Sequence, residues 1–158
     1  MKTVELVRQA AALKHLLKRV GHDQTTRSLE MQAHWARYLC VLTSGFIENI
    51  VRVIFSEYVR KNSYSQPVVR YTTKQLDSIQ NPRSDRIVTV AGAFDPGWGR
   101  AVENFLGEQY RSDAINAIMS NRHLIAHARS SNITIGQVTL YLGKIIELAE
   151  FLEVQCDL

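Results

Sequence analysis

One arginine and two histidines lie close together near residue 125, and their side chains suit acid–base chemistry on a charged substrate. They are Arg122, His123 and His127, in the run Asn121-Arg122-His123-Leu124-Ile125-Ala126-His127. Histidine exchanges a proton near neutral pH, whereas arginine stays charged and presents a planar fork to paired oxygens. Because His123 and His127 are four residues apart, a helix places them one turn from each other. The three side chains are therefore expected to converge on one edge of a helix.

Arg122 stands out because it lies where the pattern predicts an apolar side chain. At about 100° per residue it falls in the middle of one helical face. The other members of that face are apolar: Ile115, Ile118, Met119, Ile125 and Ala126. An unpaired guanidinium is costly to bury, so Arg122 should meet a carboxylate, a partner subunit or a phosphate. A structural salt bridge, with Glu48 as the carboxylate, and a catalytic role both remain open at this point.

A zinc site is the metal-binding interpretation of the same pattern. Two histidines four residues apart form half of a common helical zinc motif, in which glutamate follows the first histidine. Here Leu124 takes that place, and no cysteine lies nearby. We therefore predict no metal and no cofactor.

The first half of the chain is predicted to form two helices that support this site. Apolar residues at helical spacing run from about residue 4 to residue 20, and Gly21 suits the left-handed turn after a helix. A second, longer helix is expected from near Thr26 to about Arg60, with Ser44-Gly45 as a point of bending or close packing.

Short helices are predicted for the middle of the chain. Asn62–Pro67 reads as a loop, and the strand-like run Val68–Thr72 is discounted because a lone strand has nothing to pair with. Asn81 and Asp95 each precede a proline, which is a common way to begin a helix.

Two antiparallel helices are predicted at the C-terminal end, packed on the long helix. The penultimate one should run from about Ser112 to His127 and carry the candidate site. The last should begin at Thr134, where Gln137 three positions later completes a capping box. The connection between them, Ala128 to Ile133, is short enough to keep the two helices adjacent.

Length and composition favour one domain over residues 1–158. The chain has 158 residues, of which 46% are hydrophobic, and a net charge of +4.

Residues 52–86 hold seven basic and three acidic side chains, so a nucleic-acid-binding surface would be sought there, although a solvated basic face explains the same excess. No run of about eighteen uncharged apolar residues occurs, and we expect a cytoplasmic protein with no membrane contact.

The run Asn121–His127 resembles the Arg-polar-x-x-x-His signature of HEPN ribonucleases. Residues 38–48, which include Tyr38-Leu39 and Ser44-Gly45-Phe46-Ile47-Glu48, are similar to the long helix of the RiboL-PSP-HEPN branch. The resemblance implies an all-α, HEPN-type helical bundle with the motif in the penultimate helix. The commonest motif has asparagine after the arginine and glycine after the histidine, where this sequence has His123 and Ala128. Neither change excludes activity.

The resemblance also implies an endoribonuclease that cleaves RNA without a metal, through attack of the 2′-hydroxyl on its own phosphate. Arg122 would stabilise the charge of the transition state, and His127 would act as general acid or base. His123 would orient the phosphate or share the proton transfer, with Glu48 and Asn121 in supporting positions.

The same resemblance implies an assembly and a biological setting. Two motifs would meet across a homodimer interface, and the enzyme would act as a toxin or a defence effector restrained by an antitoxin or a sensor protein. The alternative is a non-catalytic HEPN module that binds RNA or a protein partner.

Overall fold

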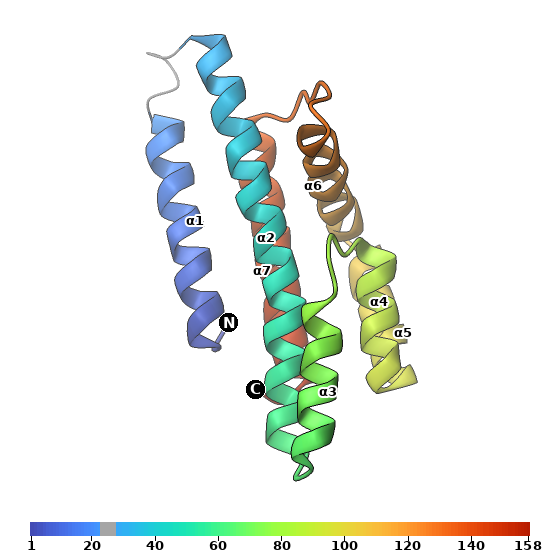
Figure 1. The fold of residues 1–158 in the computed structure, drawn as a ribbon. Coiled ribbons are helices and arrows are strands. Elements are labelled where there is room, and N and C mark those ends of the chain that lie inside the picture. Colours follow the sequence, from blue (N-terminus) through green and yellow to red (C-terminus); the bar gives the residue numbers. More distant parts are fainter. Residues whose placement is uncertain (23–27) are drawn as a thin grey trace.

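The computed structural model describes residues 1–22 and 28–158, and in these ranges it contains seven helices and no strand. In chain order the helices are α1 Val4–His22, α2 Leu29–Asn62, α3 Gln66–Asp77, α4 Ser84–Phe94, α5 Pro96–Gly107, α6 Arg111–Ala126 and α7 Ile135–Gln155. The predicted all-α bundle, with a long second helix, short helices in the middle and two antiparallel C-terminal helices, is confirmed (Figure 1).

Helix α2 forms the axis of the bundle, and α1, α3, α6 and α7 pack around it (Figure 1). Helices α6 and α7 run antiparallel and pack on each other and on α2, as predicted, while α6 also runs antiparallel to α2. Helices α4 and α5 form a hairpin beside the first half of α6 (Figure 1). The C-terminal end of α6 therefore lies near the beginning of α2.

The hydrophobic core runs along α2, whose Ile47, Ile50 and Ile54 are fully buried. Within the described ranges α2 is the one helix long and apolar enough, by length and composition, to cross a membrane. However, 67% of its most apolar stretch is buried inside the bundle, as expected of a core helix.

Two predicted helix starts are confirmed and one is wrong. The Thr134 capping box with Gln137 begins α7, and the Asp95 carboxylate accepts from two N–H groups of the first turn of α5 at 2.6 and 3.1 Å. Asn81, in contrast, caps no helix, because α4 begins only at Ser84. Asn81 instead adopts a left-handed backbone with φ of 49° in the turn that precedes α4.

The N-terminal helices differ from prediction in detail. Helix α1 continues through Gly21, and no glycine of the described ranges has a positive φ, so the predicted left-handed turn there is wrong. The predicted start at Thr26 lies outside the described residues; within them α2 begins at Leu29, after the N-cap Ser28. Nothing lies within 4 Å of a Cβ built on Gly45, so close packing at that glycine is not confirmed.

Candidate active site

Helix α6 is fixed at its first residue by a buried arginine. The Arg111 Nε donates to Glu147 of α7 at 2.8 Å and its Nη1 to the Phe105 carbonyl at 3.1 Å, while the guanidinium lies 4.0 Å from the centre of the Phe105 ring. These contacts join the start of α6 to α5 and α7. Burial by itself raises the pKa of Glu147, but hydrogen bonds and charge from Lys144 and Arg111 outweigh it and lower that pKa.

The middle of α6 packs on α2 through the predicted apolar face. Ile115 and Ile118 are fully buried and Met119 is nearly so. The Cys40 thiol of α2 donates to the Ile118 carbonyl, with the sulfur 3.5 Å from the oxygen, and burial raises the pKa of this thiol to about 12. This contact places Ile118 of α6 beside Cys40 of α2.

Arg122 lies where this apolar face opens toward solvent. Its side chain is half-buried, Ile125 is half-buried, and Ala126 is exposed, so the predicted inclusion of Ala126 in the buried face is wrong. Arg122 makes no hydrogen bond or ion pair with any described residue. A partly desolvated guanidinium without an anion is unfavourable for an isolated chain.

Glu48 has a different partner from the one considered in the sequence analysis. Its Oε1 accepts a hydrogen bond from the backbone N–H of Asn81 at 2.7 Å, and no ion pair joins it to Arg122 in the described part of the chain. The left-handed turn at Asn81 points an N–H group inward, and Glu48 satisfies it. The structural salt bridge considered for Arg122 is therefore not formed with Glu48.

The two histidines are brought together as predicted. The ring centroids of His123 and His127 are 4.4 Å apart with an interplanar angle of 58°, and both side chains are exposed. His127 is the C-cap of α6, and its N–H donates to the His123 carbonyl at 3.2 Å. Both imidazoles are thus accessible to a ligand at one end of the bundle.

Asn121 positions the loop that follows the motif. Its Nδ2 donates to the Ala117 carbonyl at 2.8 Å, and its Oδ1 accepts from the buried hydroxyl of Ser131 at 2.8 Å. Asn121 therefore links α6 to the 128–134 loop, and its predicted supporting role in the reaction stays a prediction.

Helix α6 ends in a left-handed residue, Ala128, with φ of 52°. The N–H of Ala128 donates to the Ile125 carbonyl at 3.1 Å and that of Arg129 to the Leu124 carbonyl at 2.8 Å. This is the Schellman arrangement, whose left-handed position favours glycine. The departure noted in the sequence, alanine after His127, falls at this position and affects how the helix ends.

The basic stretch 52–86 is partly neutralised. Arg52 pairs with Glu5 of α1 at 3.0 Å, and Lys61 lies 3.4 Å from Asp157. In the described part of the chain, Arg70 and Lys74 of α3 are exposed without an ion pair and flank Tyr71, whose exposed fraction is 67%. This part of α3 lies toward the opposite end of the bundle from the end of α6 (Figure 1).

Sequence reasoning did not single out Arg37 of α2. Its Nε is buried and has no hydrogen-bond partner, and Arg37 makes no ion pair within the described ranges. The available signal was its position three residues before the buried Cys40, on the same side of a helix, which is the same kind of misplacement that identified Arg122.

No group of three or more His, Cys, Asp or Glu side chains that could hold a metal ion occurs among the residues that the structure describes.

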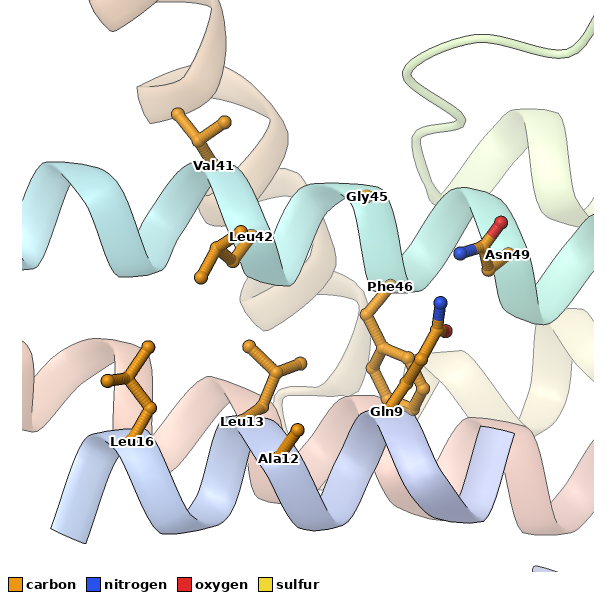
Figure 2. Close-up of a pocket in the computed structure, with 9 residues that line it drawn as sticks. All are labelled: Gln9, Ala12, Leu13, Leu16, Val41, Leu42, Gly45, Phe46 and Asn49. Atoms are coloured by element: carbon orange, nitrogen blue, oxygen red, sulfur yellow. The ribbon is translucent and has the colours of Figure 1, made fainter. Parts of the chain in front are cut away.

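A cavity of about 380 Å³ lies between α1 and α2, and Figure 2 shows Leu13, Leu42 and Phe46 among its lining residues. None of its nine lining residues is titratable, so this cavity offers no side chain for acid–base chemistry.

Comparison with known proteins gives one match. Residues 5–157 match the family model described as RiboL-PSP-HEPN. No curated protein and no solved structure matches the chain.

Proposed function

The chain belongs to the RiboL-PSP-HEPN family, and from this premise we propose that it is a metal-independent endoribonuclease. The observation that carries the proposal is the half-buried Arg122, which has no partner among the described residues, next to the exposed His123–His127 pair. A phosphate would supply an anion for Arg122, and His127 would lie beside it to move protons.

The reaction needs only groups of this chain and of the RNA. A base removes the proton of a 2′-hydroxyl, the oxygen attacks the adjacent phosphorus, and the 5′-oxygen leaves with a proton from an acid. The products are a 2′,3′-cyclic phosphate and a 5′-hydroxyl. His127 exchanges the protons, Arg122 stabilises the charge that develops on the non-bridging oxygens, and His123 orients the phosphate.

We propose a homodimer in which two such motifs face each other. The half-buried Arg122 supports it, because a second copy would complete the desolvated environment in which a guanidinium acts most strongly on phosphate. Light scattering coupled to size exclusion tests this directly: a mass of one chain at micromolar concentration would contradict it.

The test of catalysis is cleavage of a mixed RNA by the purified protein in excess EDTA. Arg122→Ala and His127→Ala are expected to abolish cleavage, whereas Arg100→Ala and His15→Ala, at exposed positions on α5 and α1, should not change it. Cyclic phosphate ends would identify the chemistry. Cleavage that survives both site substitutions would contradict the site assignment. Cleavage that stops in EDTA would contradict the metal-free mechanism.

We propose a toxin or defence role in the cytoplasm, with an antitoxin or sensor protein that restrains the enzyme. Induced expression in bacteria is expected to arrest growth, and Arg122→Ala is expected to relieve the arrest. Equal toxicity of the parent and this variant would contradict the proposed role.

An RNA-binding module without catalysis is the second candidate. The exposed Arg70, Tyr71 and Lys74 of α3 favour it, because cations beside an exposed aromatic ring suit single-stranded RNA. RNA binding without cleavage in the EDTA experiment would select this function.

A further inference from the structure

A cavity of about 550 Å³ lies between the first turns of α2 and the segment 131–136 that leads into α7. Ala33, Ala36 and Ile133 contribute an apolar wall, while Arg37 and Asn132 contribute polar groups. Pockets for small ligands commonly measure about 300–1,000 Å³, with a mostly apolar lining and a few polar groups. The cavity falls within this range of size. Its lining is more polar than usual, because Gln32, Ser131 and Thr134 add to Arg37 and Asn132, and such a lining suits a nucleotide.

The cavity adjoins the candidate active site. Ser131, one of its lining residues, donates the 2.8 Å hydrogen bond to Asn121, the residue before Arg122. The contact between Cys40 and the Ile118 carbonyl aligns the antiparallel α2 and α6. Because Arg37 lies three residues before Cys40 and Asn121 three residues after Ile118, Arg37 and Asn121 lie at the same level along the bundle.

Arg37 gives the cavity a charge that nothing in the described chain neutralises. Its side chain is half-buried, its Nε is buried without a hydrogen-bond partner, and it makes no ion pair with a described residue. Among the described residues, no acidic side chain lines the cavity. The first residues of α7, Ile135 and Gly136, line it as well. The positive end of that helix adds to the attraction for an anion. The missing partner is best matched by a phosphate, which accepts the fork of arginine.

We propose that this cavity is a nucleotide subsite, in which Arg37 binds the phosphate of an RNA nucleotide adjacent to the scissile bond and the apolar wall packs against its base. The proposal deepens the proposed function, on which it rests, by assigning a substrate-binding residue to α2. Arg37 binds and orients the RNA, whereas proton transfer stays with His127.

The experiment measures binding with an RNA that the proposed reaction cannot cleave. The probe is a 5′-fluorescein 12-mer of mixed sequence with 2′-O-methyl groups throughout, followed by fluorescence anisotropy. Arg37→Ala is expected to raise Kd about tenfold or more, as for loss of a charged hydrogen bond. The Kd of Arg37→Lys should lie between those of the parent and of Arg37→Ala, because lysine keeps the charge but lacks the planar guanidinium. Ala33→Phe, which fills the cavity without changing charge, should also weaken binding.

Arg100→Ala is the matched control, since it removes the same charge from an exposed position on α5, outside the basic stretch 52–86. It should leave Kd within about twofold, because a change this far from the cavity alters only long-range, screened attraction. Equal losses for Arg37→Ala and Arg100→Ala, unchanged binding by Arg37→Ala, or no binding by the parent would each overturn the subsite. Circular dichroism spectra confirm that each variant is folded.

Failure of the subsite and failure of the ribonuclease proposal can be told apart. If the parent cleaves unmodified RNA and Arg37→Ala cleaves it with unchanged KM, the subsite is wrong and the enzyme stands. If the parent cleaves nothing but binds the methylated RNA through Arg37, the subsite stands and catalysis fails. If Arg37→Ala instead dissociates a dimer, a second copy occupies the cavity and the subsite is wrong.

Discussion

The imidazole rings of His123 and His127 lie 4.4 Å apart, centroid to centroid, on the last turn of α6. In the proposed reaction they have unequal roles. His127→Asn is expected to lower kcat/KM by about 10²–10⁴, as for loss of a general acid or base. His123→Asn, which keeps a polar side chain, should cost less than about tenfold, as for a changed hydrogen bond. Cleavage kinetics of the two variants check this, and equal losses would assign proton transfer to both.

Ala128 should be a point where the protein can be stabilised. Its φ of 52° strains an alanine and not a glycine, so Ala128→Gly is expected to raise the free energy of unfolding by about 0.5–1 kcal/mol. Ala126→Gly is the matched control, because Ala126 is exposed and helical, and it should lower stability by about 0.5–1 kcal/mol. Urea unfolding of both variants measures the difference. Destabilisation by both would contradict the assignment of strain to position 128.

Glu48 should matter for stability and not for cleavage. Glu48→Ala leaves the Asn81 N–H without its acceptor and is expected to cost about 1–3 kcal/mol of unfolding free energy. Glu48→Gln keeps a side-chain oxygen and should cost less. Chemical denaturation gives the stabilities, and activity assays well below the unfolding transition should show parent-like rates. A large loss of kcat in a folded Glu48→Gln protein would return Glu48 to the active site.

Glu147 should make the free energy of unfolding depend on pH in the acidic range. Its pKa is lowered in the folded protein, so its contribution is complete above the unfolded value near 4.5 and is lost as the pH falls through the lower folded pKa. Glu147→Gln is therefore expected to destabilise the protein at pH 7, with a difference from the parent that shrinks below about pH 4.5. Glu103→Gln, at an exposed position on α5, should track the parent throughout. A pH-independent effect of Glu147→Gln would contradict this linkage. Thermal unfolding across pH 3–8 provides the measurement.

Local signals in the sequence determined much of the fold. The capping box at Thr134 and the cap at Asp95 are made by side chains on the backbone of their own first turns, so they could be recognised without neighbours. Asn81 carries the same local signal as Asp95, yet it forms no cap. Its N–H is held by Glu48, 33 residues away, and only packing of the turn against α2 could decide that.

For the candidate site, too, some features could be predicted from the sequence and others could not. The sequence by itself determined that Arg122, His123 and His127 share one end of a helix, because their spacing matches the helical repeat. It also marked Arg122 as misplaced on an apolar face. Only the tertiary structure decided that no carboxylate of the described residues pairs with Arg122 and that Arg37 of α2 lies level with Asn121. Those relationships depend on how α2 and α6 pack, and residues about 85 positions apart carry no local signal of their contact.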